Sequence, residues 1–212
     1  MEESSFRLRA APPTLTAEGL HLRTFSRSDA GLLVRASGDA EIVRWTFIPP
    51  NLDEAGAIAL AERWLSRAAD GQLRQYVISA QSSQPPVGMV SLVLQDPDDA
   101  RLADIAYWLL PEGRGRGLVS ASVRLVLQWA IEQSEVRRVA LYTKEGNQRS
   151  ERVAQRGGFS YTGTVRRQRG EQVLWVRRWL FEPDRHGRSE REWHLARLQG
   201  EVQGELKDRG RP

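Results

Sequence analysis

The sequence of 212 residues contains no cysteine, and none of its apolar runs approaches the length needed to span a membrane. Without cysteine, neither disulfides nor thiolate metal sites can form. The three histidines, His21, His186 and His194, are dispersed and show no His-Glu-x-x-His spacing, so we predict no metal site. The first residues, MEESSFRLRAAPP, lack the hydrophobic core of a signal peptide. We therefore expect a cytoplasmic protein without a membrane segment.

The charge is moderately basic, with 31 lysine and arginine residues against 27 acidic residues and a net charge of +4. The basic excess lies mainly after Arg114. Such a surface attracts anions, which could be a phosphorylated cofactor, RNA or an acidic substrate, and it also serves plain solubility. Because exposed arginines alone are weak evidence for nucleic-acid binding, we do not predict a nucleic-acid partner.

The stretch 102–131 predicts a buried strand, a glycine-arginine turn and an amphipathic helix. The run Ile105–Leu110 is rich in strand-forming side chains and stops at Pro111. The turn Gly113–Gly117 follows, and then apolar residues recur at helical spacing. A helix start carries unpaired N–H groups and the positive end of the helix dipole, and glycines let a phosphate approach the backbone. The turn therefore fits a pyrophosphate-binding site, and it equally fits an exposed turn with solvated arginines.

Two ordered motifs resemble those of a known superfamily. The turn matches neither a Walker loop nor the dinucleotide fingerprint, whose last glycine is replaced by Leu118. Arg114-x-x-Gly117-x-Val119 resembles the acetyl-CoA loop of the GNAT N-acetyltransferases, (Gln/Arg)-x-x-Gly-x-(Gly/Ala). Asn147-Gln-Arg-Ser150, with Gly158-Phe159 and Gly163, resembles that superfamily's Asn-x-x-Ser…Gly-Phe…Gly segment. The resemblance covers about residues 20–180 and is strongest to the RimJ/RimL-like branch, whose members acetylate N-terminal amines of ribosomal proteins and assorted small amines.

The expected fold is α/β (α+β), with a mixed, mostly antiparallel twisted sheet of about seven strands and helices on both faces, which is the GNAT layout. We expect strands at 20–25, 74–80, 87–94, 102–110, 137–143, 159–163 and 172–181, and helices at 26–37, 54–68, 118–131 and 148–156. Residues 39–51 are expected to be irregular. Residues 17–182 would form the acetyltransferase domain, after a mobile arm at 1–16. The tail 183–212 carries the capping pattern Ser189-x-x-Glu192, which predicts a helix packed on the domain or on a second subunit, or a frayed polar end.

The resemblance implies acetyl-CoA as co-substrate. Backbone N–H groups of Gly115 through Ser120 would hold its pyrophosphate, with the arginines of the turn nearby. Its pantetheine arm would enter a gap between the strand ending at Leu109 and the strand beginning at Arg137, and Asn147 would hydrogen-bond that arm. Asn147 could also simply cap the following helix. The cofactor-binding candidates are Leu109, Arg114, Gly115, Arg116, Gly117, Val119, Ser120, Asn147 and Ser150.

Direct transfer of an acetyl group from thioester to amine needs no enzyme nucleophile, which agrees with the absence of cysteine. Asp104 is the candidate general base, because a lone carboxylate among apolar strand residues is costly without a partner or a task. It occupies a place that resembles Ala-Glu-Ile in related enzymes, and would act through a bridging water. It could instead be exposed or paired with an arginine. The resemblance implies that Ser150 protonates the leaving thiolate. Where the family carries a glutamate, this chain has Arg166–Gly170.

The acceptor site is represented by three aromatic candidates, Trp45, Phe47 and Trp108, which could also be core or lid residues. The sequence therefore predicts an acetyl-CoA-dependent N-acetyltransferase acting on a primary amine, first of all the N-terminal amine of a protein or peptide. One alternative acceptor is a small amine such as an antibiotic or polyamine. Another class is a catalytically silent GNAT-like module that binds CoA or RNA. A homodimer formed through the tail is a further hypothesis.

Overall fold

The computed structural model describes residue 8 and residues 14–94, 102–133, 136–169 and 172–183. Met1–Glu182 forms one compact unit, and Pro183–Pro212 forms a second. The predicted tail helix, and the homodimer it would support, concern residues outside the described part of the chain. Among the described residues, no helix combines the length and the apolar composition that a membrane crossing requires.

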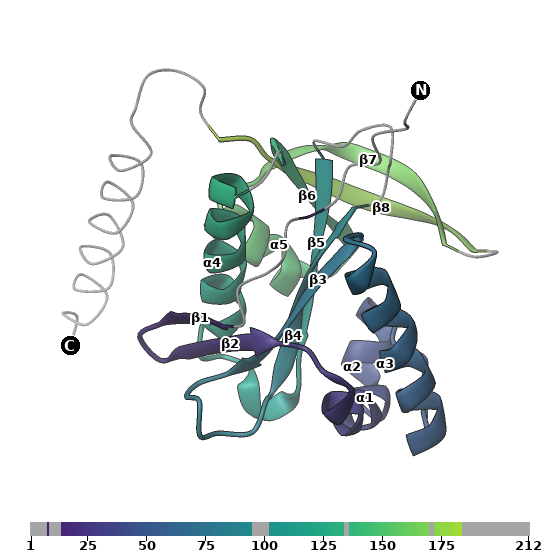
Figure 1. Cartoon of the computed structure of the whole chain (residues 1–212). Helices are drawn as coiled ribbons and strands as arrows, with labels where there is room; N and C mark the ends of the chain where they lie inside the picture. Colours follow the sequence, from purple (N-terminus) through teal and green to yellow (C-terminus); the bar gives the residue numbers. More distant parts are fainter. Residues whose placement is uncertain (1–7, 9–13, 95–101, 134–135, 170–171, 184–212) are drawn as a thin grey trace, which may run out of the picture. The chain divides into compact units, whose positions relative to one another are not determined.

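A single eight-stranded sheet organises the described residues, in the order β1-β2-β3-β4-β5-β6-β8-β7 (Figure 1). The strands are β1 Thr14–Ala17, β2 Leu20–Thr24, β3 Leu73–Ser79, β4 Gly88–Leu94, β5 Leu102–Leu109, β6 Arg138–Lys144, β7 Ser160–Arg169 and β8 Gln172–Phe181. Every neighbouring pair is antiparallel except β5 and β6, whose connection contains a helix. The expected mixed, mostly antiparallel sheet is thus confirmed.

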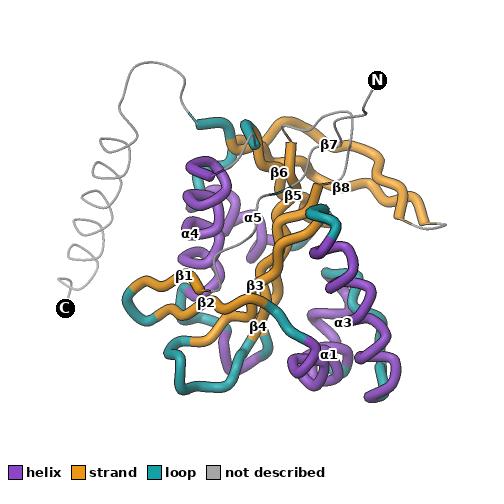
Figure 2. Tube along the Cα trace, viewed as in Figure 1, coloured by secondary structure: helices purple, strands orange, loops and turns teal. Residues whose placement is uncertain are grey.

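Helices cover both faces of this sheet, with α1, α2 and α3 on one side and α4 and α5 on the other (Figure 1 and Figure 2). They are α1 Ala30–Ser37, α2 Ala40–Trp45, α3 Glu54–Ala69, α4 Leu118–Gln133 and α5 Gln148–Arg156, with the 3₁₀ turns η1 Arg27–Asp29 and η2 Pro111–Gly113. The start of α3 is capped by Asp53, whose carboxylate accepts a hydrogen bond from the Gly56 N–H at 2.7 Å. Its buried residues Ala57, Leu60 and Ala61 follow the helical period and pack into the core.

Three elements differ from the expectation. The residues 40–45 form α2 although the segment was expected to be irregular, because a six-residue helix is too short to show a period. The strand β7 extends to Arg169 rather than ending near residue 163, because pairing with β8 continues through its polar residues. It is an edge strand of the sheet, and exposed polar residues there leave no apolar alternation in the sequence.

The third difference concerns the N-terminal segment that was expected to be a mobile arm. The side chain of Leu8 is buried, with 2% of its surface exposed, and its N–H donates to the Gly71 carbonyl at 2.8 Å. Thr14–Ala17 forms β1, which pairs with β2 while its own side chains stay largely exposed, so no apolar pattern marked it. The residues 1–7 and 9–13 of the expected arm lie outside the described residues.

The sheet opens between its two parallel strands. Pairing of β5 with β6 runs only from Leu102↔Arg138 to Ile105↔Leu141. Beyond Ile105 the two strands no longer form a ladder, although each continues for several residues. The second half of β5 therefore has one edge that is not paired within the sheet, as the resemblance implied.

Candidate active site

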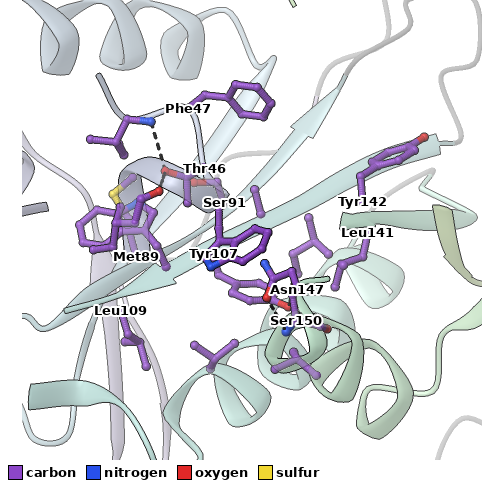
Figure 3. A pocket seen from close by; sticks show the side chains of 18 of the residues that line it. Thr46, Phe47, Met89, Ser91, Tyr107, Leu109, Leu141, Tyr142, Asn147 and Ser150 are labelled. Atoms are coloured by element: carbon purple, nitrogen blue, oxygen red, sulfur yellow. Dashed lines mark hydrogen bonds between the residues drawn. The ribbon is translucent and has the colours of Figure 1, made fainter. Parts of the chain in front are cut away.

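A cavity of about 1110 Å³ lies at this opening (Figure 3). Its walls come from the loop after α2, the strands β4 and β5, the turn before α4, and the region where β6 meets α5. It brings together most of the residues predicted from the sequence: Trp45, Phe47, Asp104, Trp108, Leu109, Arg114, Gly115, Gly117, Val119, Ser120, Asn147 and Ser150. The remaining candidate, Arg116, is exposed and is not among the lining residues.

The turn before α4 has the geometry of an anion site. Gly115 and Gly117 have φ angles of 77° and 74°, in the left-handed region that favours glycine. Within the described residues, the N–H groups of Gly115 through Ser120 donate no hydrogen bond to the protein, and the Ala121 N–H is the first to bond back, to the Gly117 carbonyl at 3.1 Å. They precede or begin a 16-residue helix, whose dipole adds positive potential. This arrangement fits a pyrophosphate.

Arg114 holds this turn in place. One guanidinium nitrogen donates to the Asp39 carboxylate at 2.7 Å, and Nε donates to the Leu109 carbonyl at 3.1 Å. Asp39 also caps α2 by accepting from the Ile42 N–H at 2.8 Å. Burial alone would raise the pKa of Asp39, but the hydrogen bonds from Arg114 and Ile42 outweigh it and lower that pKa below its ordinary value. The arginine thus links the end of β5, the turn and α2.

Asn147 and Ser150 begin α5 beside the end of β6. The Asn147 side-chain oxygen accepts a hydrogen bond from the Ser150 N–H at 3.1 Å, so the helix cap considered from the sequence is present. Among the described residues, the NH₂ group of Asn147 has no hydrogen-bond partner, although the residue lines the cavity. The carboxamide can therefore cap the helix through its oxygen and still donate to a bound molecule through its nitrogen.

Tyr107 is a residue of the site that the sequence reasoning missed. Its hydroxyl shares a hydrogen bond with the Ser150 Oγ at 2.8 Å and lies 3.4 Å from the Ser150 carbonyl oxygen. Burial raises the pKa of Tyr107 by more than the Ser150 hydrogen bond lowers it, so the phenol stays protonated at neutral pH. A protonated phenol can donate to Ser150 and leave the serine proton free for a third group. The available signal was a single hydroxyl inside the apolar run 105–110.

Asp104 is buried on β5 and forms an ion pair. Its Oδ2 accepts from an Arg167 guanidinium nitrogen at 2.8 Å, which is the salt bridge that the sequence left open as an alternative. The guanidinium of Arg167 also lies over the Tyr142 ring, 4.0 Å from its centroid. Burial raises the pKa of Tyr142, and the nearby negative charge of Asp104 raises it further. Any proton that Asp104 accepted would be taken up in competition with Arg167.

The aromatic candidates lie on different parts of the wall. Trp108 is 8% exposed and belongs to the core cluster under α1 and α3. Trp45 donates from its indole N–H to Glu41 at 3.2 Å. Phe47 is 46% exposed, and the Lys144 ammonium lies 5.4 Å from its ring centroid. Phe47 and Trp45 therefore border the cavity, whereas Trp108 forms part of its base.

Comparison with known proteins identifies the family to which this chain belongs. A model of the acetyltransferase (GNAT) domain matches residues 19–160. A Bacillus subtilis protein, provisionally named ribosomal N-acetyltransferase YdaF, is 38% identical over 79 residues, which are 37% of this chain and 43% of the relative. The chain thus aligns with less than half the length of that curated relative.

Two solved structures share the fold. RimL, described as ribosomal L7/L12 alpha-N-protein acetyltransferase in complex with coenzyme A, has a TM-score of 0.70 and 20% identity, covering 81% of this chain and 98% of its own. Spermidine N-acetyltransferase from Vibrio cholerae, in complex with CoA and spermine, has a TM-score of 0.65 and 18% identity, covering 78% and 96%. At such identities the likeness establishes the fold alone.

Proposed function

This chain belongs to the acetyltransferase (GNAT) domain family, and we propose that it transfers the acetyl group of acetyl-CoA directly to the N-terminal amine of a protein or peptide. The observation that carries the proposal is the opening between β5 and β6. It has unpaired backbone N–H groups at one end, in Gly115 through Ser120, and the Tyr107–Ser150 hydroxyl pair beside it. The two features lie on one cavity, as binding and transfer require.

The residues of the cavity have separate tasks in this proposal. The N–H groups of the turn hold the pyrophosphate, and Arg114 fixes the turn through Asp39 and the Leu109 carbonyl rather than acting as a free cation. The unpaired edge of β5 offers backbone groups to the amides of the pantetheine arm, as an added strand would use them. The Asn147 NH₂ group can donate to the same arm.

In the chemical step, bound acetyl-CoA supplies the activated acyl carbon. The acceptor amine forms a C–N bond to this carbon, and the C–S bond breaks. Ser150 donates its proton to the sulfur of the departing thiolate, while Tyr107 holds the serine oxygen by its hydrogen bond. Asp104 receives the proton lost by the amine through a bridging water. Asp104 then releases this proton to solvent and Ser150 regains one from solvent, so both side chains return to their starting protonation. No side chain of the enzyme is acylated in this route.

The charges of the cavity favour an N-terminal amine over a polyamine. Among the described lining residues the carboxylates are Glu41 and Asp104, and each faces an arginine, Arg149 at 3.6 Å and Arg167 at 2.8 Å. The basic lining residues are Arg67, Arg114, Lys144, Arg149, Arg152, Arg156 and Arg167. An acceptor with several ammonium groups would therefore meet more like charge than opposite charge. An N-terminal amine brings only one ammonium group, so it is repelled less by the basic residues of the lining.

A thermal-shift titration with acetyl-CoA, CoA and ATP, each at low and moderate salt, tests the cofactor. A ligand bound by the folded state raises the apparent stability as its concentration increases. We expect acetyl-CoA and CoA to stabilise the protein and ATP to have a much smaller effect. If none of the three stabilises it, the proposal fails. Stabilisation by CoA without thiol release on addition of any amine would indicate a silent binding module instead.

A further inference from the structure

The cavity continues past the candidate base into an apolar end. Leu73 on β3 is paired with Val93 on β4, and Val93 is paired with Asp104 on β5, so the three side chains form one row on one face of the sheet. Asp104 precedes Leu109 by five residues on β5, which places the row about 16 Å along the strand from the end that leads into the pyrophosphate turn. The row therefore lies on the side of the cavity away from that turn.

Apolar side chains from a helix and from a second strand complete this end. Trp64 on α3, together with Leu174 and Val176 on β8, lines the same cavity as Leu73 and Val93. Leu73, Val93 and Val176 are buried, with at most 8% of their surface exposed, whereas Trp64 and Leu174 are partly exposed. An apolar group bound against these side chains would leave water and would cover their exposed parts, which the hydrophobic effect favours. We call these five residues the apolar end.

The apolar end adjoins the candidate base on two elements. On the sheet, Val93 is the direct neighbour of Asp104. On the β7–β8 hairpin, Leu174 is paired with Arg167, whose guanidinium donates to Asp104 Oδ2 at 2.8 Å. Because Arg167 balances the charge of Asp104, an apolar group beside this pair meets no uncompensated carboxylate. A side chain attached close to the reacting amine would therefore reach the apolar end.

We propose that the apolar end selects acceptors whose second residue carries an apolar side chain. The inference rests on the proposed function and names a part of the acceptor that is recognised beyond the amine. Neighbouring strands lie about 4.8 Å apart, and successive α-carbons of a peptide lie about 3.8 Å apart. An acceptor whose first residue stands at Asp104 therefore brings its second residue over Val93 and Leu73. A polar side chain would lose its water there, against side chains that offer only the indole N–H of Trp64.

Two peptides that differ only in their second residue, leucine or the similarly shaped asparagine, test this subsite. We expect wild-type kcat/KM to favour the leucine peptide roughly tenfold, because burial of leucine is favourable and burial of an unpaired carboxamide is not. Leu174→Ser and Val93→Thr should each reduce this ratio roughly threefold or more, mainly by slowing the leucine peptide. Val173→Ser is the matched control and should keep the wild-type ratio, because Val173 lies on the opposite face of β8, is 48% exposed and does not line the cavity.

The possible results separate this inference from the proposed function. If wild type acetylates both peptides equally well, or if Leu174→Ser and Val93→Thr keep the wild-type ratio, the subsite is wrong while the proposed function stands. If wild type releases thiol with neither peptide, the proposed function fails and the subsite fails with it. Melting temperatures of the variants show whether they fold. Should Leu174→Ser not fold, the ratio in Val93→Thr alone decides, since threonine keeps the branched shape that suits a strand.

Discussion

The hydroxyl of Tyr107 lies 2.8 Å from the Oγ of Ser150, so a residue from the middle of β5 meets one from the first turn of α5 at the opening of the sheet. Asn147 fixes the position of Ser150 from the other side by accepting its backbone N–H. Ser150 is therefore held by its backbone and by its side chain. This dual support suits a group that must deliver a proton to a defined place.

Replacing Tyr107 with phenylalanine should slow the chemical step. The change removes only the hydroxyl that holds the Ser150 oxygen, so we expect kcat to fall about tenfold with little change in the KM for acetyl-CoA. Steady-state kinetics measured by thiol release give both values. Tyr161→Phe is the matched control, because Tyr161 is exposed on β7 and does not line the cavity. A normal kcat in Tyr107→Phe would contradict the proposed role.

Replacing Arg114 with alanine should weaken both stability and cofactor binding. The guanidinium joins the turn to Asp39 and to the Leu109 carbonyl, and its loss leaves the mostly buried Asp39 carboxylate without its cationic partner. We expect a loss of about 1–2 kcal/mol in the free energy of unfolding. The exposed Arg116 should change stability by less than about 0.5 kcal/mol when replaced. Denaturant unfolding of Arg114→Ala and Arg116→Ala, with and without CoA, measures both stability and cofactor binding. Equal losses of stability in the two variants would contradict the structural role of Arg114.

The role of Asp104 can be separated from its ion pair with Arg167 by pH dependence. If Asp104 accepts the proton of the amine, Asp104→Asn should lower kcat/KM and remove the acid limb of the pH profile. Arg167→Met should move that limb to higher pH, because the carboxylate loses the cation that favours its charged form. An unchanged profile in Asp104→Asn would leave this residue with a structural role only.

Stability should depend on pH through Asp39. Its folded-state pKa is lowered, because the hydrogen bonds from Arg114 and Ile42 outweigh the effect of burial. The ionised form therefore stabilises the folded state above the ordinary pKa of the carboxyl, and this stabilisation is lost as pH falls through the lowered value. Asp39→Asn keeps a good helix cap but removes the charge. Its melting temperature should lie a few degrees below wild type at pH 7, and the gap should narrow towards pH 3.

If the gap between Asp39→Asn and wild type stayed constant from pH 7 to pH 3, the ion pair with Arg114 would not contribute through the charge of Asp39. Other carboxylates also titrate in this range. The difference between the two proteins is therefore the relevant quantity, because the other carboxylates are common to both and cancel to first order.

Elements with a strong local pattern could be predicted from the sequence. The helix α3 has a cap at Asp53 and a regular apolar stripe, and α5 has its cap at Asn147. The segment that became α2 has a cap as well, at Asp39, but only six residues follow in the helix. The strands β1 and β7 are held by pairing with a neighbour rather than by burial, so their positions depend on the sheet and not on their own residues.

The contacts within the site could not be predicted from the sequence, because they join residues that are far apart along the chain. Arg114 and Asp39 are 75 positions apart, and Tyr107 and Ser150 are 43 apart, so only the folded sheet brings each pair together. Motif and resemblance identified two of these four residues, Arg114 and Ser150, whereas Asp39 and Tyr107 were not predicted as site residues.

The most direct test of the central proposal is acetylation of a peptide with a free N-terminal amine and no lysine. The protein is incubated with acetyl-CoA, the product is analysed by fragmentation mass spectrometry, and free thiol is measured in parallel. We predict one acetyl group on the N-terminal nitrogen, one thiol released for each acetyl transferred, and a much lower rate in Ser150→Ala. A protein that is stabilised by acetyl-CoA but transfers no acetyl group to any such peptide would contradict the proposal.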